Sequence, residues 1–165
     1  MQTPASTILY ADKQKFYREL ASDLRGFLEK NWLMNLANFS ALLNQHLPEI
    51  NWVGFYLATG EELRLGPFQG LPACTRIPFG KGVCGTSAAS KKIIVVDDVD
   101  QFPGHIVCDG NSKSEIVIPL CLQDRVLGVL DIDSPVPARF DDHDRQGLES
   151  LTKILIELTE WPAHF

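Results

Sequence analysis

Two segments near the N-terminus have the apolar spacing of amphipathic helices. Within residues 12–29, apolar side chains recur at steps of three and four and fall on one helical face, at Phe16, Leu20, Leu24 and Phe27. Residues 33–47 repeat this spacing, and the second helix is expected to end before Pro48, because a proline disfavours helical backbone in the residue that precedes it. We expect both helices to pack on one face of a β-sheet.

The next segments alternate in the manner of β-strands. Residues 50–57 are rich in aromatic and β-branched side chains and predict a strand, and residues 63–69 predict a second, antiparallel strand after a turn at 59–62. Because side chains alternate along a strand, the first strand should place Trp52, Gly54 and Tyr56 on one face and Val53, Phe55 and Leu57 on the other.

Glycine and proline dominate residues 66–85, which predict turns around a short strand at 74–77. A short helix is expected over residues 86–92. That helix would place Cys84 near a helix N-terminus, where the partial positive charge of unpaired N–H groups favours a thiolate.

A short strand at residues 93–96 leads into a long loop at 97–114. Loops of this length are uncommon in compact domains and are often binding loops or lids. Cys108 lies in the middle of the loop, where its sulfur can be reached. The nearby His105 is interpreted as an ordinary loop residue and is given no role.

Residues 115–122 and 125–133 form the clearest element, an antiparallel hairpin. Asp131 and Asp133 are two positions apart, so their carboxyl groups should project from the same face of the sheet. Glu115 begins one strand and the two aspartates end its partner. The hairpin should therefore bring the three acidic side chains to one edge.

A final helix is predicted from about residue 141 to 160, with an acidic first turn that suits the helix dipole. The elements together predict an α+β fold with a central, mainly antiparallel sheet covered by helices on one face. At 165 residues the chain is expected to be one domain, with N-terminal helices over about 12–47, the sheet and its loops over about 50–134, and the last helix after them.

The composition is typical of a globular protein that stays in solution. Hydrophobic residues make up 45% and charged residues 22%, without an apolar segment long enough to span a bilayer. The first residues lack the basic and apolar pattern of a signal peptide, so we expect a cytoplasmic protein. A net charge of −6 disfavours nucleic acid and anionic membranes as partners.

The four cysteines suggest redox chemistry, because cytosolic disulfides are usually transient and catalytic or redox-sensing. Cys74, Cys84 and Cys108 lie in loop or turn contexts, whereas Cys121 lies in an apolar run and is expected to be buried. The spacing contains no C-x-x-C pair of the kind that zinc sites use, so no metal or other cofactor is expected.

Seven segments together resemble the free methionine-(R)-sulfoxide reductases, which are single GAF domains acting on the free amino acid. The resemblance covers nearly the whole chain, at residues 51–56, 65–70, 73–78, 80–86, 104–109, 114–119 and 128–134. It implies a GAF-like fold and reduction of free L-methionine-(R)-sulfoxide, with the enzyme restored by thioredoxin or a similar dithiol. Preference for the R epimer rests on the resemblance alone.

The resemblance also implies roles for individual residues. Cys108 would be the nucleophile, Cys74 and Cys84 the candidates to resolve it as a disulfide, and Trp52 and Tyr56 the pocket wall. The acidic groups around the substrate would be Glu115, Asp131 and Asp133. The spacing leaves open whether Cys108 or Cys84 attacks first.

Elementary chemistry agrees with this assignment. Attack by a thiolate on a sulfoxide needs a proton at the departing oxygen, and a carboxyl group crowded by other carboxylates is a suitable acid. Glu115, next to Asp131 and Asp133, is the candidate for that acid. A resolving thiol would convert the resulting sulfenic acid into a disulfide.

Two other functions fit the same sequence. The chain could be a GAF module that binds a small effector without chemistry, or a thiol-based redox sensor that forms the disulfide but ignores methionine sulfoxide. A homodimer formed through the first or last helix is a further expectation.

Overall fold

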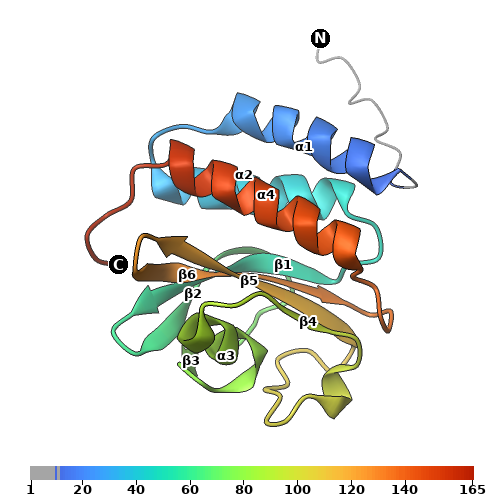
Figure 1. Cartoon of the computed structure of the whole chain (residues 1–165). Helices are drawn as coiled ribbons and strands as arrows, with labels where there is room; N and C mark the ends of the chain where they lie inside the picture. The colour runs from blue at the N-terminus through green and yellow to red at the C-terminus, as the bar shows by residue number, and fades with distance from the viewer. Residues whose placement is uncertain (1–9, 11) are drawn as a thin grey trace.

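The computed structural model describes residue 10 and residues 12–165. They form a β-sheet with three helices on one side and a fourth helix on the other (Figure 1). The sheet is antiparallel throughout, in the order β3-β2-β1-β6-β5-β4. Its strands are β1 (Trp52–Thr59), β2 (Glu62–Gly70), β3 (Arg76–Pro78), β4 (Ile94–Val96), β5 (Ser114–Leu122) and β6 (Arg125–Ser134). The helices are α1 (Lys13–Phe27), α2 (Trp32–His46), α3 (Gly82–Ser90) and α4 (Asp142–Leu158), with a 3-10 turn η1 (Val99–Gln101).

The helices predicted at the two ends of the chain are confirmed, with caps that explain where they start. The Asp12 side chain accepts a hydrogen bond from the backbone N–H of Lys15 and caps α1. Asn31 caps α2 in the same way. At α4, Asp141 and Asp144 form a reciprocal capping box, in which each side chain accepts from the backbone N–H of the other.

The expectation that both N-terminal helices pack on the sheet is wrong for α1. α2 packs on β1 and β2 and α4 packs on β5, while α1 lies outside this layer against α4 and α2 (Figure 1). Phe16, Leu20 and Leu24 are fully buried there because their apolar face meets other helices. The spacing of apolar residues identifies the buried face of a helix, but not the element that buries it.

A buried carboxylate joins α1 to α4. The Asp144 side chain is inaccessible to solvent and accepts hydrogen bonds from Tyr17 Oη at 2.8 Å, Lys13 Nζ at 2.7 Å and Arg139 Nη1 at 3.3 Å. Tyr10 Oη also donates to it. Two cations and two hydroxyl groups therefore compensate the buried charge, as such a group requires.

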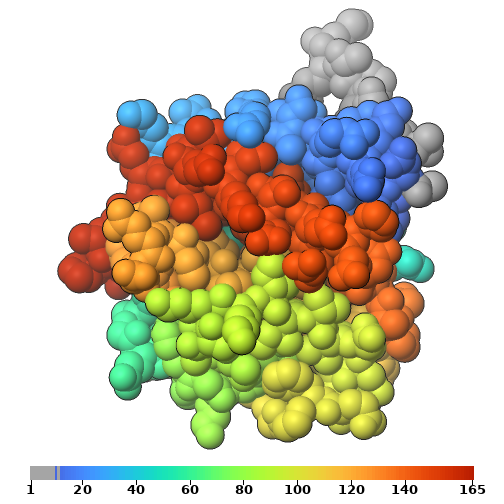
Figure 2. Space-filling model, in the orientation of Figure 1, coloured from blue at the N-terminus to red at the C-terminus, as the bar shows by residue number. Residues whose placement is uncertain are grey.

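The second face of the sheet is covered as well, which the sequence did not predict. α3 packs on β5 and β6 on the side opposite α1, α2 and α4, and it begins at Gly82, before the expected residue 86. In Figure 2, the α3 segment (green) and the loop after β4 (yellow) fill the lower half of the molecule. No helix in the described part of the chain combines the length and the apolar character that a membrane crossing requires.

The strand alternation predicted for β1 is confirmed. Val53, Phe55 and Leu57 belong to the core beneath α2 and α4. Trp52 and Tyr56 belong to a second cluster on the α3 face, together with Val83 and Cys84 of α3. The sheet thus separates a large apolar core from a smaller, partly polar space, and the candidate site lies in that space.

Candidate active site

A cavity lies between α3, the sheet and two loops. Its lining includes Trp52, Tyr56, Glu115, Asp131 and Asp133 from the strands, residues 81–84 at the start of α3, residues 71–73 before β3, and His105, Ile106, Cys108 and Asp109 of the long loop. Including its open mouth the hollow measures about 550 Å³.

Strand register brings the three predicted carboxyl groups together. Glu115 of β5 lies directly opposite Asp133 of β6, and Trp52 of β1 lies opposite Asp133 from the other side. Asp131 is two positions along the same face and pairs with Gly54. Glu115 and Asp131 are each 5% exposed, and Asp133 is partly exposed at the cavity.

Burial makes ionisation of this acidic cluster unfavourable. It raises the pKa of Glu115 well above its usual range, and the charges of Asp131 and Asp133 raise that pKa further. Burial also raises the pKa of Asp131 to about 6, and burial together with Asp131 raises the pKa of Asp133. Among the described residues, Asp131 Oδ1 has no hydrogen-bond partner although it is buried. The cluster therefore favours either protons or a bound cation.

Replacement of Asp131 by asparagine is expected to change how stability depends on pH. The pKa of Asp131 rises from 3.8 to about 6 on folding, so the folded state holds a proton that the unfolded chain releases, and stability is lost as pH rises through this window. The difference of about two units corresponds to roughly 3 kcal/mol at most. Urea unfolding between pH 4 and 8 should show that Asp131→Asn loses less stability than the wild type on going to pH 8.

The control is Asp124→Asn, at an exposed position in the turn between β5 and β6. It should retain the wild-type dependence on pH. Parallel pH profiles for the wild type and Asp131→Asn would show that burial of this carboxyl group carries no stability cost.

Cys84 lies in the first turn of α3, whereas the sequence placed it just before the helix, and the expectation of a thiolate there is wrong. Its side chain is 4% exposed and its thiol donates to Glu115 Oε1 across 3.9 Å. Burial raises the pKa of the Cys84 thiol well above its ordinary value, and Asp131 and Glu115 add to this effect. Desolvation and neighbouring negative charge outweigh the helix dipole.

The same three side chains could hold a positive charge. Cys84 Sγ and carboxyl oxygens of Glu115 and Asp131 lie within 4.8 Å of one another, close enough to share one metal ion. An organic ammonium group would also compensate the negative charge of the carboxyl groups. Unlike a metal ion, it would not need Cys84 to be a thiolate.

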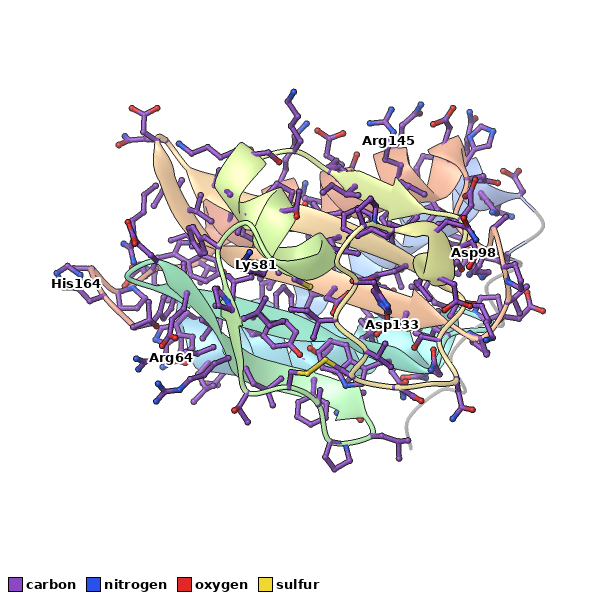
Figure 3. All side chains as sticks on the ribbon, turned by 90° about the horizontal axis from the view of Figure 1, so that it is seen from below. Arg64, Lys81, Asp98, Asp133, Arg145 and His164 are labelled. Carbon is purple, nitrogen blue, oxygen red and sulfur yellow. A yellow bond between two sulfur atoms is a disulfide. The ribbon has the colours of Figure 1, made fainter. Side chains whose placement is uncertain are left out.

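Two of the four cysteines form a disulfide at the mouth of the cavity. Cys74, in the turn before β3, is bonded to Cys108 of the long loop, with their Cα atoms 5.7 Å apart. The disulfide is drawn in yellow in Figure 3, where it lies in front of the strands, lower in the view than the labels of Lys81 and Asp133 and between them from left to right. Cys108 is exposed and Cys74 is half-buried. Cys121 is half-buried on β5, so the expectation that it is buried is wrong.

The loop that carries Cys108 is anchored to Asn51, the residue that precedes β1. Asn51 Nδ2 donates to Asp109 Oδ2 at 3.0 Å and to Ser112 Oγ at 3.1 Å. His105 lines the cavity and its Nε2 lies 3.7 Å from Glu115 Oε2. Burial lowers the pKa of His105, so the imidazole is mostly neutral at pH 7. Sequence reasoning gave neither Asn51 nor His105 a role. The signals that could have suggested one are that Asn51 precedes Trp52 and that His105 lies three residues before Cys108.

The aromatic side chains form a continuous wall. The Trp52 ring stacks on Tyr56 with centroids 5.8 Å apart and on Phe68 of β2 at 5.2 Å. Gly54 lies between Trp52 and Tyr56 on the same face, and a methyl group there would collide with Phe68 and lie 2.9 Å from the carbonyl oxygen of Pro67. The absence of a side chain at Gly54 therefore allows Phe68 to approach Trp52.

The start of α3 contributes positive charge on another side of the cavity. Gly82 and Val83 belong to the first turn of the helix, whose N–H groups have no partner within the helix, and the N-cap residue Lys81 supplies no capping hydrogen bond. The Lys81 side chain is exposed at the cavity, which its lining includes (Figure 3). An acidic floor and a positive helix end together suit a small zwitterion.

Comparisons of the sequence with known proteins identify a family with this fold. A family model described as GAF domain matches residues 20–155, so the chain belongs to the GAF domain family and the predicted α+β, GAF-like fold is confirmed. It is 51% identical over 142 residues to the free methionine-R-sulfoxide reductase of Escherichia coli, covering 85% of this chain and 86% of that protein. Within the GAF proteins, the chain belongs to the family that contains these reductases, as its motifs predicted.

Two further comparisons support this membership. The free methionine-R-sulfoxide reductase of Saccharomyces cerevisiae is 44% identical over 154 residues, with 87% of this chain and 86% of that protein covered. A structure of free methionine-R-sulfoxide reductase from Neisseria meningitidis in complex with its substrate superposes with a TM-score of 0.81 and is 43% identical, covering 95% of this chain and 92% of that one.

Proposed function

We propose that this protein reduces free L-methionine-(R)-sulfoxide to L-methionine through a cysteine sulfenic acid and an intramolecular disulfide. The observation that carries the proposal is the Cys74–Cys108 disulfide at the mouth of a cavity with an acidic floor and an aromatic wall. The relatives named free methionine-R-sulfoxide reductase support the same activity and substrate.

The cavity offers a partner for each part of this substrate. The ammonium group binds at the carboxyl cluster, where it compensates the buried charge of Asp131. The carboxylate lies toward the first turn of α3 and Lys81, and the methyl group attached to sulfur packs on Trp52 and Tyr56. Peptide-bound methionine sulfoxide lacks both charges, so the site favours the free amino acid.

Substrate enters the reduced protein. The disulfide ties the Cys108 loop to the Cys74 segment at the cavity mouth and leaves neither cysteine as a thiol, so reduction comes first and frees both. The Cys108 thiolate then attacks the sulfoxide sulfur while Glu115, whose raised pKa keeps it protonated, delivers a proton to the oxygen. The protonated oxygen then moves from the substrate sulfur to the Cys108 sulfur, which breaks both the sulfur–oxygen bond of the substrate and the new sulfur–sulfur bond. Methionine leaves with that electron pair as a thioether, and Cys108 is left as a sulfenic acid.

Cys74 resolves the sulfenic acid. Its thiol attacks the Cys108 sulfur, a sulfur–sulfur bond forms and water leaves, which produces the disulfide of this structure. Cys84 remains a buried thiol beside Glu115 and takes no part in this bond. An external dithiol such as thioredoxin then supplies two electrons, so each methionine released consumes one dithiol.

The test compares four substrates with the wild-type protein and an excess of dithiol. Free L-methionine-(R)-sulfoxide should yield methionine at one dithiol per product, whereas the S epimer and the N-acetylated and peptide-bound forms should react at least a hundredfold more slowly. A redox sensor would form the Cys74–Cys108 disulfide with hydrogen peroxide but release no methionine, and a binding module would do neither. Either outcome would refute the proposal.

The cytoplasmic location and the homodimer expected from the sequence stay predictions.

A further inference from the structure

The two most exposed large apolar side chains of the described chain lie beside the disulfide. Val107 is 67% exposed and precedes Cys108, and Leu71 is 58% exposed and lies three residues before Cys74. Other exposed apolar side chains, such as Leu33 and Met34, lie on the helical layer away from the cavity. Exposed apolar groups that cluster at a reactive bond indicate a contact surface more strongly than scattered ones.

Leu71 is exposed at the cavity mouth, where it is part of the lining, and Val107 lies outside the lining and is exposed to solvent. Neighbouring residues anchor the segment that carries each of them. The backbone carbonyl of Leu71 accepts a hydrogen bond from Trp52 Nε1 at 3.1 Å, which ties this segment to the aromatic wall. Ile106 packs on the apolar cluster of the α3 face and contacts Gly82, whereas the next residue along the loop, Val107, is exposed to solvent. The exposure of both groups thus follows from the anchoring of their neighbours.

We propose that Leu71 and Val107, which we call the disulfide rim, form the docking surface for the protein that reduces Cys74–Cys108. Two side chains are far too small an apolar area for a stable complex or a dimer, which buries about 1,200 Å² or more, but they suit a transient redox encounter at the low end of interface sizes. The partner is a small protein with a dithiol surrounded by apolar surface. This inference rests on the proposed function and names the partner surface of the same site.

Exposure also decides which sulfur the partner attacks. Cys108 is exposed and Cys74 is half-buried, so the partner's thiolate attacks Cys108. The Cys74–Cys108 bond breaks, Cys74 leaves as a thiolate and takes up a proton, and a mixed disulfide joins Cys108 to the partner. The partner's second thiol then attacks that bond, releases Cys108 and leaves the partner oxidised, which transfers two electrons.

The experiment measures reduction of the oxidised protein directly, without methionine sulfoxide. Thioredoxin, with thioredoxin reductase and NADPH, is compared with dithiothreitol as reductant of the wild type and of the double variant Leu71→Ser/Val107→Ser. The second-order rate with thioredoxin should fall at least about tenfold in the double variant, while the rate with dithiothreitol stays within twofold. The matched control Leu33→Ser/Met34→Ser changes side chains of similar exposure, at 50% and 53%, and should leave both rates unchanged.

Two outcomes would overturn the proposal. Equal thioredoxin rates for the wild type and the rim variant would show that docking does not use the rim. Thioredoxin that lacks its second cysteine should trap a mixed disulfide, and a tryptic peptide linked at Cys74 rather than Cys108 would refute the order of attack. Because neither measurement uses the sulfoxide, a failure here is distinguishable from a failure of the reductase activity.

Discussion

Cys108→Ser is expected to release no methionine from free L-methionine-(R)-sulfoxide, even in a single turnover of fully reduced protein. Serine keeps the size of the side chain but replaces a thiolate with a hydroxyl group that neither attacks sulfur nor accepts its oxygen. The rate should fall by at least about a thousandfold, the scale at which loss of a nucleophile acts. The single-turnover rate is measured by rapid quenching followed by quantification of the released methionine.

The other cysteines provide the contrast. Cys74→Ser should release one methionine per protein and then stop, because the sulfenic acid at Cys108 lacks the partner to which it is bonded in the structure. Cys121→Ser, at a half-buried position outside the cavity, should match the wild type. A single turnover that survives in Cys108→Ser and disappears in Cys84→Ser would move the nucleophile to α3, the alternative that the sequence left open.

Glu115→Gln is expected to slow methionine release by about 10²–10⁴-fold, the usual contribution of a positioned acid. The amide keeps the size and the hydrogen-bonding capacity of the side chain but carries no transferable proton. The pKa of Glu115 is raised, so wild-type activity should decline as pH rises through that raised value and the acid is lost. Single-turnover rates measured at increasing pH should show this decline in the wild type and not in Glu115→Gln.

The matched control is Glu61→Gln, an exposed position in the turn between β1 and β2. It should leave both the rate and the pH profile unchanged. If Glu115→Gln retained the wild-type rate, the proton would have to come from another group at the floor, and Asp133→Asn would then be the variant to measure.

The sequence predicted the acidic floor because that arrangement depends on local regularities. Alternation along β6 places Asp131 and Asp133 on one face, and a hairpin with a short turn fixes Glu115 opposite Asp133. The same alternation assigned Trp52 to this face. None of these inferences required knowledge of distant contacts.

Features that depend on distant contacts were missed or mistaken. The pKa of Cys84 follows from burial under the sheet and from carboxyl groups on β5 and β6, and neither appears in the residues around it. The choice of Cys74 as the partner of Cys108 depends on the path of the long loop across the cavity mouth. The position of α1 depends on which neighbour, sheet or helix, meets its apolar face.

The sheet keeps the helical layer and the cavity on opposite sides of the molecule (Figure 1). If two copies pair through α1 or α4, their disulfides would face outward at the two far ends of the assembly. Each copy could then bind its own electron donor at the same time as the other copy, and the two subunits of the dimer would turn over independently.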